Sequence, residues 1–386
     1  MTTNPDHSTS LQLLHCGVDF FPHLVDAIAA ARREIFLETY IFFDDTTGAE
    51  VAGALVAAAR RGVAVHLMID GFGSKEYPRE KLQAMRAQGV QIRIYRPGFL
   101  NFRFLRTGLR RLHRKLAVID RQQAYVGGIN ILHDFDPGCT SPRFDYAVAI
   151  RGPLVDDVLR AVTSLWSLVS WSQLRRRGSH CRMGVRPTSE VLAGENQTAR
   201  LVLRDNLRNR RAVEAAYLQA IQGAKSEIVI ANAYFLPGNA LLQALIDAAR
   251  RGVAVTLLLQ GRVEYFMQHY ASEFLYGRLL QAGVCIHRYQ AALLHAKVAV
   301  IDGCWATVGS SNMDPFSLQL AREANLVIRD TGLIGELRAS LCRALVTDSE
   351  AVSSSRWAAA SIARKAMMWC CYRSLRLSQQ LVTRGD

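Results

Sequence analysis

The sequence has few lysines and no long apolar stretch. Only six of its 47 basic residues are lysine, and no run of about 18 apolar residues occurs, which is the length that a helix needs to cross a bilayer. The nearest approach, residues 357–372, is interrupted by Arg364 and Lys365. The opening MTTNPDHSTS lacks the basic and apolar regions of a secretory signal. We therefore expect any membrane contact to be peripheral.

Clusters of metal-binding residues are also missing. The eight cysteines are scattered, with neither a Cys-x-x-Cys pair nor a Cys/His group at zinc spacing, and this favours reduced thiols. The acidic pairs at 44–45, 134/136 and 156–157 lie beside turn formers or at expected helix starts, where carboxylates act as caps. We predict no metal site.

The chain is rich in apolar residues and in positive charge. Its 386 residues are 50% hydrophobic, enough for two or three domains with substantial cores. The formal charge of +14 predicts attraction to a polyanion, which could be nucleic acid or an anionic membrane surface. Charge alone does not choose between these partners.

Two halves of the sequence repeat each other. LHRKLAVID at 112–120 matches LHAKVAVID at 294–302, and VGGIN at 126–130 matches VGSSN at 308–312, both 182 positions apart. ARRGVAV occurs at 59–65 and again at 249–255. A duplicated domain with trimmed loops produces such ordered pairs. We predict an α/β protein with one domain in 1–185, a second in 186–350 and a basic, apolar tail in 351–386, each domain being a mixed sheet flanked by helices.

Each repeated motif offers the same chemical groups. Side chains alternate along a strand, so His113 and Lys115 point to one side, as do His295 and Lys297. The turn that follows each motif brings back one asparagine. An imidazole, an ammonium and an amide from each half suit a phosphate oxyanion better than carbonyl chemistry.

These doubled motifs resemble those of the phospholipase D superfamily. Four further stretches make the chain resemble bacterial cardiolipin synthases of the B type, namely LETYIFFDDTTG, LRDN, ANAYFLPG and FDYAVAIRGP. The resemblance covers most of the chain. It implies two domains related by a pseudo-twofold axis, a shared central active site and no cofactor. It also implies phosphatidyl transfer through a covalent phosphohistidine, with His113 as the nucleophile and His295 as the acid/base. The near symmetry of the motifs leaves the reverse assignment open.

The resemblance assigns further roles to other residues. Asp120 and Asp302 complete the catalytic motifs, although their place at the far ends of the strands predicts a structural role. Asp145 and Glu323 are expected to orient the histidines. The groups expected to contact the substrate phosphate are Lys115, Lys297, Asn130, Asn312 and Ser310.

A segment before the first motif is predicted to contact lipid. On a helical wheel, residues 102–114 place arginines on one face and Phe and Leu on the other, the pattern of an interfacial helix. An ordinary surface helix is the alternative. The expected contacts are Phe102, Arg103, Phe104, Leu105, Arg106, Arg110 and Arg111.

The function predicted from these features is cardiolipin synthesis from phosphatidylglycerol, with a second phosphatidylglycerol or with phosphatidylethanolamine. Hydrolysis by the same residues and nuclease activity are the alternatives, and the apolar face at 102–112 counts against nucleic acid as the partner. The predicted partner is an anionic membrane containing phosphatidylglycerol and cardiolipin, at the cytoplasmic face of the bacterial inner membrane. The oligomeric state is left open.

Overall fold

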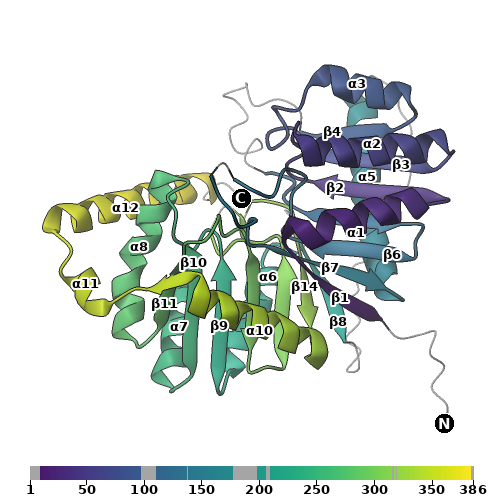
Figure 1. The fold of residues 1–386 in the computed structure, drawn as a ribbon. Coiled ribbons are helices and arrows are strands. Elements are labelled where there is room, and N and C mark those ends of the chain that lie inside the picture. The colour runs from purple at the N-terminus through teal and green to yellow at the C-terminus, as the bar shows by residue number, and fades with distance from the viewer. Residues whose placement is uncertain are drawn as a thin grey trace, which may run out of the picture.

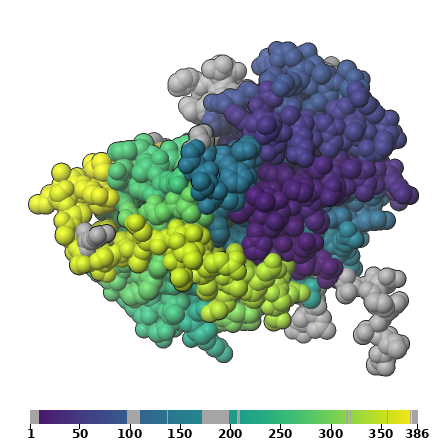
Figure 2. All heavy atoms as spheres, viewed as in Figure 1, coloured from purple at the N-terminus to yellow at the C-terminus, as the bar shows by residue number. Residues whose placement is uncertain are grey.

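The computed structural model describes residues 9–96, 110–136, 138–176, 198–205, 209–314, 317–318 and 320–383. Two α/β domains lie side by side, with the N-terminal domain on the right of Figure 1 and the C-terminal domain on the left. Their surfaces meet along a continuous boundary in Figure 2. Among the residues that the structure describes, no helix is both long and apolar enough to cross a membrane.

The first domain is built on a seven-stranded mixed sheet. Its strand order is β1-β7-β6-β5-β2-β3-β4, and β2, β3 and β4 are parallel while the other pairs are antiparallel. The strands are β1 (Ser10–His15), β2 (Glu34–Thr39), β3 (Ala64–Asp70), β4 (Gln91–Tyr95), β5 (Lys115–Ile119), β6 (Gln123–Gly127) and β7 (Tyr146–Arg151). The helices are α1 (Cys16–Ala30), α2 (Thr46–Arg60), α3 (Arg79–Ala87) and α5 (Leu154–Arg176).

The second domain repeats this topology. Its strand order is β15-β11-β10-β9-β12-β13-β14-β8. Counted from β8, these strands follow the same order as the first sheet does from β1, and β15 is an additional strand at the far edge. The strands are β8 (Ala199–Arg204), β9 (Glu227–Asn232), β10 (Ala254–Gln260), β11 (Cys285–Tyr289), β12 (Lys297–Ile301), β13 (Trp305–Gly309), β14 (Glu323–Ile328) and β15 (Ser349–Ala351). The helices are α6 (Ala212–Gly223), α7 (Asn239–Arg250), α8 (Phe266–Gln281) and α10 (Thr331–Thr347). The predicted fold class is confirmed.

One apolar core joins the two domains. It takes side chains from the facing sides of both sheets and from α5 and α10. Helix α5 contacts β8 of the second sheet, and α10 contacts β1 of the first. The outer faces of the two sheets are covered separately by α1–α3 and by α6–α8. This central layer fixes the position of one motif strand relative to the other.

The C-terminal segment packs on the second domain. Helices α11 (Ser354–Ala358) and α12 (Ile362–Thr383) contact α8, and Met368 and Cys371 are buried there. Arg364 of α12 donates to the Glu273 carboxylate of α8 over 2.8 Å. The domain boundaries stay a prediction, but this tail is part of the second domain's surface and core (Figure 1).

Candidate active site

The motif strands β5 and β12 begin at Lys115 and Lys297. Each motif histidine lies two residues before its strand, at the junction of the two domains. The backbone at each histidine is bonded to the opposite domain: the His113 amide donates to the Arg322 carbonyl, and the His295 amide donates to the Phe144 carbonyl, each over 2.9 Å. Each motif is thus bonded, at its histidine, to the segment that precedes β14 or β7 of the other domain, so both histidines lie at the domain junction.

Each histidine also pairs with a carboxylate from the other domain. His113 Nδ1 lies 3.1 Å from Glu323 Oε2 and 3.0 Å from the Ser310 carbonyl oxygen. His295 Nδ1 lies 2.5 Å from Asp145 Oδ2. A carboxylate on Nδ1 fixes the ring and leaves Nε2 as the reacting nitrogen. The imidazole side chains remain 15% and 17% exposed, so the site is nearly closed to bulk water.

The two carboxylates differ in their surroundings. Glu323 accepts hydrogen bonds from the hydroxyls of Ser310 and Ser317 as well as pairing with His113. Burial acts to raise the pKa of Glu323, but His113, Lys115 and the Ser310 hydroxyl hold that pKa below its ordinary value. Burial raises the pKa of Asp145 to about 6, against the opposing effect of Lys297. Glu323 is thus the more strongly stabilised anion of the two.

Both motif lysines are buried beside the histidines. Lys115 Nζ donates to the His113 carbonyl over 2.8 Å, and Lys297 Nζ donates to the His295 carbonyl and lies 3.8 Å from Asp145. Burial lowers the pKa of Lys115 to about 7 and that of Lys297 to about 8. A bound phosphodiester anion would favour the charged ammonium groups, so the site gains positive charge when such a substrate binds.

The histidines are disposed to be neutral. Burial lowers the pKa of His113, although Glu323 acts to raise it, and burial together with the two motif lysines lowers the pKa of His295 further. A neutral imidazole is the form that can attack phosphorus.

The two asparagines that follow the motifs are buried. Asn130 and Asn312 are each 5% exposed. The Asn130 side chain accepts from the Ile41 amide over 3.2 Å, and the Asn312 amide nitrogen of the backbone donates to Ser317 Oγ over 2.9 Å. Ser310 is fully buried and bonded to Glu323. The direct phosphate contacts predicted for these residues stay a prediction.

The motif aspartates lie away from the histidines. Asp120 accepts from the backbone amides of residues 32–34, and Asp302 accepts from those of residues 225–227, at 2.7–3.0 Å. Both adopt a left-handed backbone, with φ of 52° and 51°, at the turn into the next strand. They anchor that turn to the start of the neighbouring strand, the structural role that their position indicated.

The segment before the first motif differs from the predicted interfacial helix. Residues 110–114 are not helical, and Leu112 forms a bridge with Arg322 of the second domain. Arg111, predicted to contact lipid, is buried, lies 3.6 Å from Asp70 and sits over the Phe72 ring. This expectation is wrong for Arg111 because Asp70 draws the guanidinium inward. Arg110 is partly exposed, and the other predicted lipid contacts, residues 102–106, lie outside the described residues.

Some residues at the site had no clear signal in the sequence. The Tyr40 ring packs edge-on against His113, with centroids 4.9 Å apart. Asp70 accepts from the Leu112 amide over 2.9 Å, next to His113. Ser317 reaches Glu323 from the loop after the second motif. Tyr40 lies in residues 27–42, which resemble residues 220–235 of the second half. This repeat was the only sequence feature that pointed to Tyr40.

Solved structures share this two-domain arrangement. The phosphatidylserine synthase of Haemophilus influenzae matches 96% of this chain and 94% of its own with a TM-score of 0.72 at 13% identity. A polyphosphate kinase from Porphyromonas gingivalis matches 96% of this chain and 53% of its own, with a TM-score of 0.58 at 16% identity. At these identities the likeness shows the fold alone. The family model whose description includes a PLD-like domain matches both halves of the chain, so the class is a protein with two phospholipase D-like domains.

Sequence comparison narrows this class. The family described as cardiolipin synthase, PLD-like domain, matches residues 24–158 and 217–344. Cardiolipin synthase B of Salmonella typhi is 41% identical over 355 residues, covering 89% of this chain and 82% of its own, and that of Escherichia coli K12 is 38% identical over 351 residues with the same coverage. The chain belongs to the phospholipase D-like cardiolipin synthase family.

Proposed function

We propose that this protein is a cardiolipin synthase that transfers a phosphatidyl group from one phospholipid to another through a covalent phosphohistidine. The observation that carries the mechanism is that both histidines lie at one domain junction, each with a carboxylate of the opposite domain on its Nδ1. The family relationship supports the lipid substrate. Phosphatidylglycerol donates or accepts the phosphatidyl group. Its partner is a second phosphatidylglycerol, or phosphatidylethanolamine, which has no free hydroxyl and therefore acts only as the donor that releases ethanolamine.

The first step breaks the bond from phosphorus to the head-group alcohol. The bound phosphodiester anion favours the protonated form of His295 by offsetting the charge of the two lysines. His113 Nε2 attacks phosphorus, and this protonated His295 gives its Nε2 proton to the departing alkoxide oxygen. In the second step His295 takes the proton of the acceptor hydroxyl, whose oxygen attacks phosphorus and displaces His113. Lys115 and Lys297 offset the negative charge of the non-bridging oxygens.

The difference between the carboxylates favours His113 as the nucleophile. Glu323 is held as an anion by two serine hydroxyls, so it stabilises the positive charge that forms on His113 during attack. Asp145, whose pKa burial raises to about 6, leaves His295 better suited to giving up and regaining a proton. The nearly closed site favours an alcohol acceptor over water.

We also propose that the protein works at the cytoplasmic face of the bacterial inner membrane as a peripheral protein. The support is a run of exposed apolar side chains before and at the start of α8, namely Val263, Tyr265, Phe266 and Met267, which we call the apolar rim. A run of this kind is suited to insertion among lipid acyl chains. The net charge of +14 favours an anionic lipid surface.

Purified protein incubated with phosphatidylglycerol vesicles tests the reaction. We expect cardiolipin and glycerol as products, measured by mass spectrometry, and we expect His113→Ala to abolish both. Phosphatidate as the main lipid product would indicate hydrolysis instead. Nuclease activity that is lost in His113→Ala, with no lipid product from the wild type, would overturn the proposal.

A further inference from the structure

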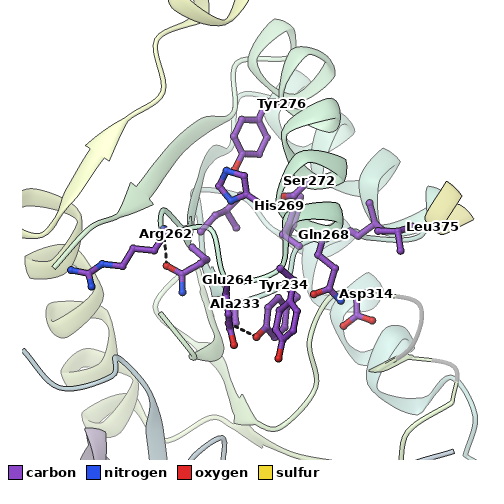
Figure 3. Close-up of a pocket in the computed structure, with 15 residues that line it drawn as sticks. Ala233, Tyr234, Arg262, Glu264, Gln268, His269, Ser272, Tyr276, Asp314 and Leu375 are labelled. Carbon is purple, nitrogen blue, oxygen red and sulfur yellow. Dashed lines mark hydrogen bonds between the residues drawn. The ribbon is translucent and has the colours of Figure 1, made fainter. Parts of the chain in front are cut away.

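A pocket in the second domain adjoins the His295 half of the site. Its wall includes Ala233, whose amide donates to the Ala296 carbonyl over 3.0 Å, and Gln260, whose side chain donates to the Leu294 carbonyl over 3.2 Å. These two bonds attach the pocket to the residues on either side of His295. The pocket is formed where β9 and β10 end and α8 begins, and Leu375 of α12 closes one side (Figure 3).

Two of the residues that line this pocket are carboxylates. Glu264 and Asp314 contribute carboxylates, and the Tyr234 hydroxyl donates to Glu264 Oε2 over 2.5 Å. Asp314 also accepts from the Ser317 amide over 3.1 Å. Figure 3 shows Tyr234 and Glu264 together, joined by this hydrogen bond.

The nearby arginine does not offset these acceptors. Arg262 lines the pocket, but its side chain extends away in Figure 3 and donates to the carbonyls of Gln290 and Ala291 over 3.0 Å. Two carboxylates repel a phosphate and attract groups that donate hydrogen bonds. The pocket therefore has the chemistry to bind hydroxyl or ammonium groups, and the phosphodiester belongs over the motif lysines instead.

We propose that this pocket holds the small alcohol head group that leaves or enters during transfer, with Glu264 and Tyr234 as its binding residues. The inference rests on the proposed function, in which His295 exchanges a proton with that alcohol. A head group bound against the residues flanking His295 would present its hydroxyl to the acid/base. Glycerol and ethanolamine share the required chemistry, since both carry a hydroxyl and a second hydrogen-bond donor.

Head-group exchange measures this site directly. Phosphatidylglycerol vesicles serve as the donor, and labelled glycerol or ethanolamine serves as a soluble acceptor whose KM is determined. We expect Glu264→Gln and Tyr234→Phe each to raise the KM for glycerol about tenfold, the usual effect of losing one hydrogen bond that involves a charged group. Glu350→Gln, on the edge strand β15, is the matched control and should keep the wild-type KM.

The two acceptors distinguish the mode of recognition. If Glu264→Gln raises the KM for glycerol and for ethanolamine equally, Glu264 binds the head group by hydrogen bonding. If the KM for ethanolamine rises more, Glu264 forms an ion pair with the ammonium group. Either result places the head group in the pocket. Wild-type KM values in both variants, with an active wild-type enzyme, would overturn this inference alone. A wild-type enzyme that transfers no phosphatidyl group to any alcohol would overturn the proposed function itself.

Discussion

At the scale of single residues, the site depends on carboxylates that reach across the domain junction. Glu323 and Asp145 stand at the start of β14 and just before β7, yet each pairs with the histidine of the other domain. A positioning carboxylate of this kind fixes the tautomer of its imidazole and stabilises the imidazolium form. The two carboxylates lie in corresponding places of the repeat, but only Glu323 is bonded to two serine hydroxyls.

Glu323→Gln is therefore expected to slow the reaction by about 100-fold or more, since a reacting imidazole that loses its orienting carboxylate forfeits an effect of at least this size. Glu323 acts to raise the pKa of His113, so its removal should lower that pKa further. The acidic limb of the kcat/KM profile should then move to lower pH. The measurement is transfer to glycerol as a function of pH.

The matched control is Glu336→Gln, which removes a carboxylate from the exposed pair with His15. This control should leave rate and pH profile unchanged. If the transfer rate of Glu323→Gln stayed within a few-fold of the wild-type rate and the acidic limb of its pH profile did not move, the positioning role of Glu323 would be contradicted.

At the scale of elements, the motif strands are anchored by the aspartates at their far ends. Asp302 accepts the backbone amides of residues 225–227 and the hydroxyl of Ser226, which ties the turn after β12 to the start of β9. These bonds outweigh the effect of burial and lower the pKa of Asp302 to about 2. Asp120 has the same arrangement in the first domain.

We expect Asp302→Asn to reduce the free energy of unfolding by about 1.5–3 kcal/mol at pH 7, the range for hydrogen bonds to a charged group. The folded pKa of Asp302 lies below its ordinary value of 3.8, so its contribution is present above that value and is lost as pH falls toward 2. Urea unfolding at several pH values should show the difference between wild type and variant shrinking below pH 4. A difference that is constant with pH would contradict the role of the charge.

At the scale of the whole molecule, the two domains form a single unit with one shared core. The facing sides of both sheets and the helices α5 and α10 build that core, and the site lies where the motif segments cross between domains. The apolar rim adjoins the pocket in which we place the head group, and Tyr265 belongs to both. Membrane attachment through the rim would place the pocket and the catalytic histidines next to the lipid head groups.

The double variant Phe266→Ser/Met267→Ser tests this attachment. Two large apolar side chains, 54% and 46% exposed, would leave the bilayer interface, and full burial of one such side chain is worth about 1.5–3 kcal/mol. We expect at least tenfold weaker binding to phosphatidylglycerol vesicles, measured by co-sedimentation. Val346→Ser, which removes an 83% exposed apolar side chain from α10, should bind as the wild type does. Equal sedimentation of all three proteins would exclude the rim as the contact.

Local sequence determined much of this protein. The alternating apolar strands, the repeated helix and strand pairs and the doubled motifs predicted two mixed α/β domains, and the strand period placed each lysine on the side of its histidine and each aspartate at the far end. These features follow from the backbone geometry of short segments, so they can be read from neighbouring residues.

Tertiary structure alone decided which groups meet. Glu323 lies 210 positions from the histidine that it orients, and Arg111 turned inward to Asp70 although its neighbours suggested a lipid-facing helix. The amphipathic pattern failed there because a buried carboxylate and a bridge to the second domain outweighed local helix preference. Pairings of this kind depend on how two domains pack, and no local pattern in the sequence encodes that packing by itself.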